Sequence, residues 1–161
     1  MRIATVVVLL LASSLASSGE RTLEPLEFLV GHCWSGTFAD GKSVDTHCFE
    51  AVYGGQFVRD RHVVRGDKPD YHGESLYWRD GQSGTIRYLY FNSDGGVSHG
   101  TLEPKADRLQ FGDEEYTGPD GKVQRFRTVW QRRGADTYVA TTEQQNGEEW
   151  QPAWRVEFTR Q

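Results

Sequence analysis

Residues 33–48 read CWSGTFADGKSVDTHC, and this stretch decides the fold. Asp40-Gly41 is a signal for a type I′ hairpin turn, whose two central residues both need a positive φ. Residues equidistant from such a turn are paired, and Cys33 is as far from Asp40 as Cys48 is from Gly41. The sequence therefore predicts two antiparallel strands in which Cys33 faces Cys48.

The cysteine pair is expected to form a disulfide, because the chain has only these two cysteines and exported proteins oxidise such pairs. The bridge would stabilise the fold by about 2–4 kcal/mol. Counting outward from the turn places Cys33 and Cys48 at a hydrogen-bonded position, and a bulge would shift the register by one residue. The alternative, a reactive or metal-binding thiol pair, lacks C-x-x-C or zinc-type spacing.

Turn signals recur at nearly constant intervals along the rest of the chain, and most contain Gly or Pro. Intervals of this length fit a strand of about ten residues followed by a tight connection. Nine turns imply ten strands, and closure into an up-and-down barrel removes the exposed edges of so wide a sheet. Two stacked sheets are the alternative. The signals lie at 40–41, 54–55, 67–69, 80–81, 94–96, 105–107, 119–121, 134–136 and 146–147.

Large apolar side chains alternate with polar ones between these turns, as at 126–131 and, in even-numbered positions, at 150–158. A period of two predicts strands with one buried face and one wet face. The apolar residues of 23–30 could instead form a turn or two of helix, with Pro25 in its first turn. We expect this short helix to plug one open end of an all-β barrel.

The N-terminus has the features of a secretory signal. Arg2 precedes an apolar run from Ile3 to Ala12, and small polar residues follow up to Ser18. The run is too short to span a bilayer, which takes about 20 apolar residues. We expect a signal peptide over 1–18, cleaved after Ala16 or Ser18, and a single mature barrel domain over 19–161. The location would be periplasmic or extracellular.

Charge and motifs exclude several classes of function. Without residues 1–18 the chain carries 17 basic and 23 acidic side chains, which argues against nucleic acid and anionic membrane surfaces as partners. The sequence holds no nucleophile elbow, phosphate-binding loop or dinucleotide fingerprint. No cofactor and no metal are predicted, because the histidines at 47, 62, 72 and 99 lie on separate strands without chelating spacing.

Residues 28–34 read FLVGHCW and resemble the opening of an exported bacterial lipocalin-like (calycin-type) β-barrel family, which begins with G-x-W or with Phe-Leu-x-Gly-x-Trp. The spacing departs by one residue from G-x-W. The resemblance implies a cavity for small hydrophobic molecules. It also implies that Trp34 packs at the barrel bottom beneath an Arg, for which Arg155 and Arg160 are candidates.

Two other relatives of the fold fit less well. Fatty-acid-binding proteins hold a carboxylate with an Arg-x-Tyr pair on their last strand, but here Arg155 is followed two residues later by Glu157. Nitrobindin-like barrels bind haem through a His near the C-terminus, but the last His is His99. Neither the carboxylate anchor nor the haem site is therefore expected.

Aromatic side chains on the inward face are the candidate ligand contacts, because apolar and aromatic groups dominate small-molecule sites. The predicted ligand-binding residues are Trp34, Phe38, His47, Tyr88, Tyr90, Phe126, Trp130 and Trp154.

Polar residues are expected to share that face. The predicted register places Asp45 and His47 beside Trp34, and buried groups of this kind must be paired. They could form a ligand-recognition group, a structural network or, with His62, a catalytic acid/base set. Parity alone does not decide whether Asp60 and His62 or their neighbours Arg59 and Arg61 point inward.

Other charged residues are assigned to the solvent. Arg125 and Arg127 flank Phe126, so we expect them on the wet face rather than in an inward carboxylate clamp. Glu114-Glu115 and Glu148-Glu149 lie beside predicted turns, where solvated charge explains them.

Three functions follow from these expectations. The favoured one is binding of a small hydrophobic or amphipathic molecule inside the barrel. The alternative is a small-molecule enzyme that uses the histidine and aspartate side chains in the same cavity. A third is a filled barrel whose outer surface binds another protein.

Overall fold

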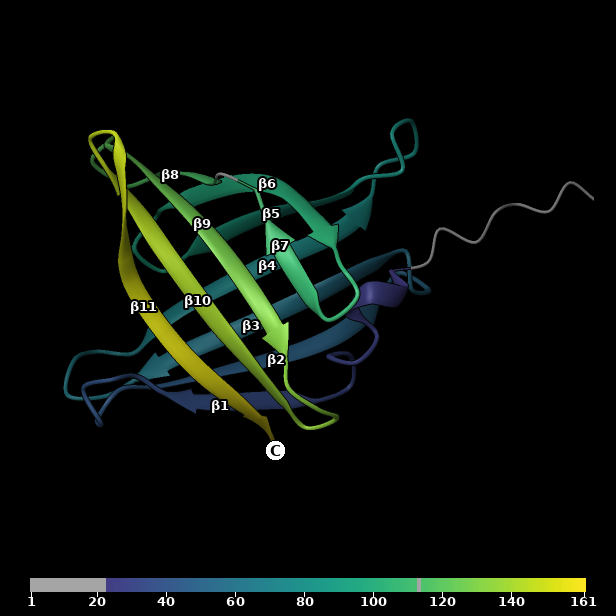
Figure 1. Ribbon diagram of the computed structural model, residues 1–161, viewed down its shortest axis with the longest axis horizontal. Coiled ribbons are helices and arrows are strands. Elements are labelled where there is room, and N and C mark those ends of the chain that lie inside the picture. The colour runs from purple at the N-terminus through teal and green to yellow at the C-terminus, as the bar shows by residue number, and fades with distance from the viewer. Residues whose placement is uncertain (1–22, 113) are drawn as a thin grey trace, which may run out of the picture.

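The computed structural model describes residues 23–112 and 114–161, and within them one antiparallel sheet closes into a barrel (Figure 1). Strands β7 and β8 both lie between β6 and β9, so the wall has ten strand positions. The elements are η1 (Glu24–Leu26), β1 (Cys33–Thr37), β2 (Val44–Val52), β3 (Phe57–Arg65), β4 (Tyr71–Arg79), β5 (Ile86–Asn92), β6 (Val97–Pro104), β7 (Arg108–Phe111), β8 (Glu114–Thr117), β9 (Val123–Arg132), β10 (Thr137–Asn146) and β11 (Glu149–Arg160).

The predicted barrel of ten strands in meander order is confirmed, and the two-sheet alternative is wrong. Each of the nine predicted turns separates two strands. The seventh predicted strand is split into β7 and β8, which pair with opposite ends of β6. Closure explains the outcome, because β1 pairs with β11 and leaves no free edge there.

The disulfide and the register of the first hairpin are confirmed. Cys33 is bonded to Cys48, and the paired positions continue through Trp34 with His47 and Gly36 with Asp45. The hydrogen-bonding position predicted for the cysteine pair is wrong. Their Cα atoms are 4.0 Å apart, as in a non-hydrogen-bonded antiparallel pair.

A longer turn causes this difference. The Phe38 N–H donates to the Ser43 carbonyl, so the loop has four residues rather than two. Asp40 accepts hydrogen bonds from the backbone N–H groups of Lys42 and Ser43 at 2.9 Å each. Gly41 has a φ of 70° whereas Asp40 does not have a positive φ, which excludes type I′. The longer loop stays centred on the same two residues and therefore preserves the register.

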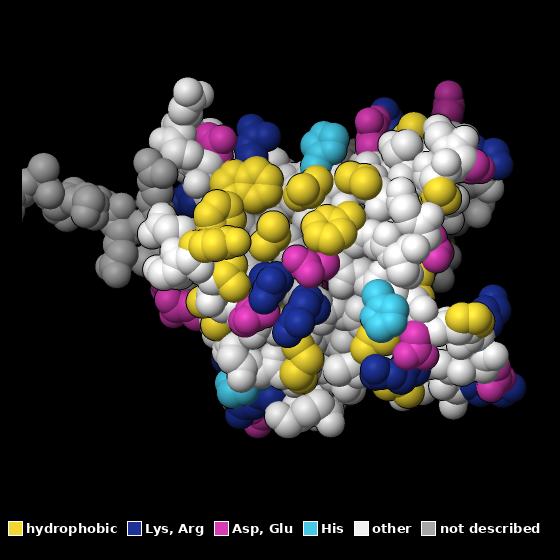
Figure 2. Space-filling view, turned by 180° about the vertical axis from the view of Figure 1, so that it is seen from behind, with side chains coloured by type: hydrophobic (Ala, Val, Ile, Leu, Met, Phe, Trp, Pro, Cys, Tyr) yellow, Lys and Arg dark blue, Asp and Glu magenta, His cyan; other side chains and the backbone are white. Residues whose placement is uncertain are grey.

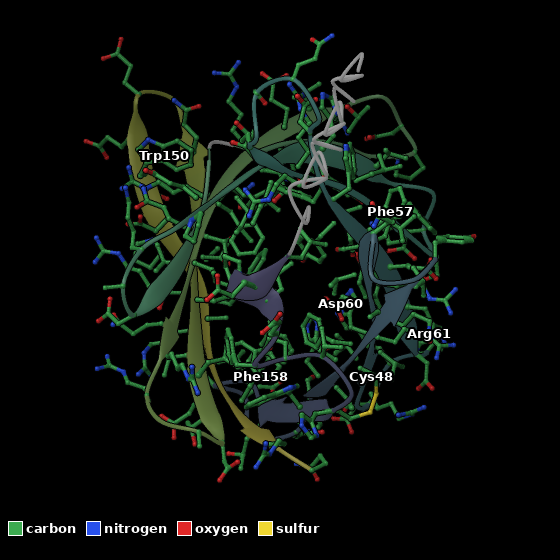
Figure 3. All side chains as sticks on the ribbon, turned by 90° about the vertical axis from the view of Figure 1, so that its right-hand side faces the viewer. Cys48, Phe57, Asp60, Arg61, Trp150 and Phe158 are labelled. Atoms are coloured by element: carbon green, nitrogen blue, oxygen red, sulfur yellow. A yellow bond between two sulfur atoms is a disulfide. The ribbon has the colours of Figure 1, made fainter. Side chains whose placement is uncertain are left out.

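The predicted plug is present at one end of the barrel. Figure 3 shows the barrel from this end, at which η1 lies. Leu26 and Leu29 are completely buried with Trp34 and Tyr138 in one cluster. The Trp34 Nε1–H donates to the Leu29 carbonyl at 3.3 Å. Trp34 therefore ties the plug to the first strand of the wall.

Of the two arginines predicted beside Trp34, Arg155 is exposed, whereas Arg160 lies directly opposite Trp34 in the pairing of β1 with β11 and pairs with Asp136. A further arginine, Arg132, forms a cation–π contact at this end, with its guanidinium carbon 4.9 Å from the centre of the Phe28 ring. Phe28 in turn meets Trp34 edge-on. Sequence parity could not reveal this contact, because Phe28 lies outside the strands.

The last strand departs from the predicted alternation. Thr142 pairs with Trp154 but Glu143 pairs with Pro152, so a bulge lies at Ala153. Proline cannot donate to the ladder, which favours such a bulge. Trp154 faces the interior, whereas Trp150 lies outside against Arg127. The expectation that residues 150–158 share one inward apolar face is therefore wrong at Trp150.

Candidate functional site

A cavity of about 540 Å³ occupies the barrel above the plug. It opens at the end opposite η1, where exposed Gln124 and the 45% exposed Trp154 lie at its mouth. Its lining is mainly aromatic and comprises Phe38, Asp45, His47, Asp60, His62, Val64, Tyr71, Ser75, Tyr77, Tyr88, Tyr90, Phe111, Glu114, Tyr116, Gln124, Phe126, Thr128, Trp130, Ala140, Thr142, Gln144, Trp154, Val156 and Phe158.

Most of the predicted ligand-contact residues line this cavity. Phe38, His47, Tyr88, Tyr90, Phe126, Trp130 and Trp154 do so. Trp34 does not, because it is fully buried in the closed end. The sequence did not single out Phe111 and Phe158, although they follow the same inward parity as their neighbours.

The parity of β3 is decided by its pairing with β2. His47 lies opposite His62, and Phe49 opposite Asp60. Asp60 consequently points into the barrel and Arg61 away from it (Figure 3). Arg59 is outside as well, where it donates to Glu50 at 2.6 Å. The inward set of β3 is therefore Asp60 and His62.

His47 is held between two carboxylates. Its Nδ1 lies 2.8 Å from Asp60 Oδ2, and its Nε2 lies 3.1 Å from Asp45 Oδ2. Phe158 meets the imidazole edge-on at 5.2 Å between ring centres. Both ring nitrogens can donate at once only in the imidazolium form, so the geometry fits a charged His47.

The electrostatics agree with a charged His47. Burial alone would lower its pKa, but the Asp60 and Asp45 carboxylates outweigh burial and raise the pKa to about 10. For Asp45, burial acts to raise the pKa, whereas the charge of His47 and hydrogen bonds from His47 and His62 bring it well below the ordinary value. One imidazolium thus faces two carboxylates in this network.

The network continues toward the cavity mouth. His62 stacks on His47 with ring centres 4.6 Å apart, and its Nδ1 lies 3.0 Å from Asp45 Oδ1. The other nitrogen, Nε2, lies 3.3 Å from the Tyr90 hydroxyl, which is 2.6 Å from the Tyr71 hydroxyl. With Nδ1 donating to Asp45, Nε2 is placed to accept from Tyr90, so both ring nitrogens of His62 have partners.

A glycine makes room for this arrangement. Gly73 is paired with His62 across β3 and β4. A Cβ at Gly73 would lie 2.2 Å from His62 Nε2 and 2.7 Å from Tyr90 Cε2. The absence of a side chain at this position therefore allows both rings to lie against the wall.

General acid/base chemistry needs a nitrogen that can accept a proton. In His47 both nitrogens are occupied as donors to carboxylates. In His62 both are engaged as well, with Asp45 and Tyr90. The contacts therefore correspond to a satisfied hydrogen-bond network, the structural alternative among the three predicted roles, more closely than to a poised acid/base pair.

Asp45, His47 and His62 each offer one possible metal-ligand atom, and these atoms lie within 4.8 Å of one another. The predicted register places Asp45 and His47 on one face with His62 as a possible third member, but it predicts no metal, because the residues lack chelating spacing. An imidazole lone pair lies in the ring plane, so one ion would have to lie near both planes. The His47 and His62 rings are stacked with only 15° between their planes. The two histidines could therefore bind the same ion only if the rings rotated. His72 and His99 are exposed and take no part.

A further carboxylate lines the cavity on the opposite wall. Glu114 lies on β8 opposite Phe126 of β9, and its Oε1 accepts a hydrogen bond from Ser98. The neighbouring Glu115 is outside and pairs with Arg125. The interpretation of Glu114 as a solvated turn charge is therefore wrong, because strand β8 begins at this residue and turns it inward.

The outer face carries the remaining charges and an apolar patch. Arg125 and Arg127 are exposed, as predicted, and pair with Glu115 and Glu143. Over β3, β4 and β5, apolar side chains gather on the surface (Figure 2). This outer patch includes Leu76 beside Leu89 and Phe57 beside Trp78. The third predicted function was a filled barrel whose outer surface binds another protein. The cavity shows that the barrel is not filled.

Comparison with protein-family models finds no match, and comparison with curated proteins finds none either. The architecture is a closed antiparallel barrel consistent with a calycin-like fold. None of the helices in the described ranges, 23–112 and 114–161, has the length and apolar character that crossing a membrane requires.

Proposed function

We propose that this protein binds a small hydrophobic or amphipathic molecule inside the barrel, as the lipocalin-like resemblance implies. The observation that carries the proposal is the open cavity of about 540 Å³ with its mainly aromatic lining. Small-molecule sites in proteins occupy about 300–1,000 Å³ and combine apolar walls with a few fixed polar groups. The proposed ligand contacts are Phe38, His47, Tyr88, Tyr90, Phe126, Trp130 and Trp154.

We also propose that the protein acts after export, with residues 1–18 removed as a signal peptide. These residues lie outside the described part of the chain. Support comes from the Cys33–Cys48 disulfide, since such bridges persist mainly in oxidising compartments. The mass of the mature protein purified from its host will test both the cleavage position and the bridge.

Binding can be tested with a neutral fluorescent probe, N-phenylnaphthylamine, and a pair of matched variants. Thr128 and Thr142 face the cavity and lie 2.9 Å apart across β9 and β10, whereas neighbouring Thr141 is exposed. We expect Thr128→Phe to fill part of the cavity and weaken probe binding about ten-fold or more. Thr141→Phe adds the same side chain outside and should leave binding unchanged.

Native mass spectrometry of protein from its own host gives an independent test. A small molecule that travels with the unmodified protein and is lost from Thr128→Phe would support the proposal. Equal probe binding by both variants, with no retained molecule, would reject an interior site.

A further inference from the structure

The charged residues that line the cavity are unbalanced in sign. Asp45, Asp60 and Glu114 contribute carboxylates, and no Lys or Arg from the described ranges lines it. The basic groups present are the imidazoles of His47 and His62. An anionic ligand group such as a carboxylate would therefore enter without a guanidinium or ammonium partner.

The three carboxylates differ in what neutralises them. Asp45 and Asp60 are both bonded to His47, and Asp45 also accepts from His62. Glu114, in contrast, forms no ion pair with any cationic side chain in 23–112 and 114–161. It is partly buried and accepts a hydrogen bond from Ser98. A carboxylate away from bulk water is costly without a cation.

A buried tyrosine hydroxyl lies beside Glu114. Tyr88 is 3% exposed and lines the cavity, and its hydroxyl has no hydrogen bond of standard geometry in the part of the chain that the structure describes. Burial, the nearby Glu114 charge and a hydrogen-bonding interaction with the Glu114 side chain raise the Tyr88 pKa, so the phenol stays protonated and its O–H is a donor toward that carboxylate. The lone pairs of its oxygen can accept from a ligand N–H donor.

The surrounding walls suit a cation as well. Glu114 lies opposite Phe126 in the sheet, and the Tyr116 ring meets Phe126 edge-on at 6.4 Å. The Tyr88 ring meets Phe111 at 5.5 Å. Aromatic faces attract cations, with the largest effect where water is excluded. The site therefore combines a carboxylate, a hydroxyl acceptor and aromatic walls.

We propose that the cavity selects amphipathic organic cations, whose protonated amine binds Glu114 and Tyr88 while the apolar part lies along the aromatic walls. This inference rests on the proposed interior binding and names the class of ligand. The charged His47 does not make the cavity repel a cation, because its single positive charge is outnumbered by the carboxylates of Asp45 and Asp60.

Three probes with the same apolar chain test the charge preference: octylamine, octanol and octanoate. Each is titrated by isothermal calorimetry into the mature protein with its disulfide intact. We expect octylamine to bind about ten-fold or more tightly than octanol, because hydrogen bonds to charged groups are the stronger class. Octanoate should bind most weakly.

Two variants of adjacent residues locate the effect. Glu114→Gln removes the charge but keeps an acceptor for Ser98, so the preference for octylamine over octanol should disappear. Glu115→Gln removes an equal charge from the outer face and should leave the preference intact. Octanol affinity serves as the folding control for both variants.

The outcomes separate this inference from the function on which it rests. If the three probes bind equally, or octanoate binds best, the cavity still binds ligands and the cation preference is wrong. If none of them binds and the neutral fluorescent probe also fails, both proposals are rejected. Persistence of the preference in Glu114→Gln would overturn the assignment to Glu114.

Discussion

The two ends of the barrel are built from the same strands but hold different interiors. At the closed end, Leu26, Leu29 and Trp34 are completely buried. At the open end, side chains of the same inward parity surround a cavity. Apolar burial stabilises the closed end, whereas the open end places polar groups around the cavity. The comparison indicates that stability and ligand chemistry are separated along the barrel axis.

Two Trp→Ala substitutions give the largest expected contrast between the ends. Trp34 is fully buried and donates to the Leu29 carbonyl, so Trp34→Ala should lower the unfolding free energy by about 3–5 kcal/mol. Trp154 is 45% exposed at the mouth, and Trp154→Ala should cost less than about 1.5 kcal/mol. Urea unfolding measures both values. Equal losses would contradict the division between a stabilising end and a binding end.

The polar network gives the open end a pH-dependent stability. His47 has an ordinary pKa of 6.5 that is raised to about 10 in the folded protein. Its stabilisation is therefore complete below pH 6.5 and is lost, by a few kcal/mol, as the pH rises through about 10. The pKa of Asp45 is lowered from 3.8, so its contribution is present above that pH and is lost on acidification.

Unfolding free energies measured across this pH range in the unmodified protein and in His47→Gln will test the network. The alkaline decline should be smaller in the variant, because the group that loses its proton is absent. An identical decline in both proteins would show that His47 is not the group responsible.

The disulfide is expected to have an intermediate effect. Cys33 and Cys48 join β1 to β2 near the closed end. Replacing both with serine should lower the unfolding free energy by about 2–4 kcal/mol. Thermal unfolding of oxidised, reduced and Cys33→Ser/Cys48→Ser proteins provides the measurement. Binding of the neutral probe should survive, since neither cysteine lines the cavity.

A glycine pair gives the smallest effect. A Cβ at Gly73 would collide with His62 and Tyr90, so Gly73→Ala should cost about 1–3 kcal/mol and shift the His62 ring resonances in NMR spectra. Gly134 has open space for a Cβ and no positive φ, so Gly134→Ala should remain within about 0.5 kcal/mol. Unchanged His62 resonances in Gly73→Ala would argue against the proposed close packing.

Local patterns predicted much of the wall but less of the site. Turn residues and alternation were sufficient for ten strand positions, because both act over a few neighbouring residues. They failed at Trp150, where a bulge reverses the parity, and at Glu114, where the seventh predicted strand is split and β8 begins. Single shifts of this kind invert which side chains face inward.

The sequence by itself determined the barrel, the Cys33–Cys48 bridge and the shared face of Trp34, Asp45 and His47, because pairing about a central turn follows from local order. Tertiary structure alone decided that His62 and Asp60 close a network around His47 and that the interior is hollow. It also decided that Glu114 faces the cavity without a cationic partner in the described ranges. These features depend on distances between strands that are remote in sequence, and closure of the barrel sets those distances.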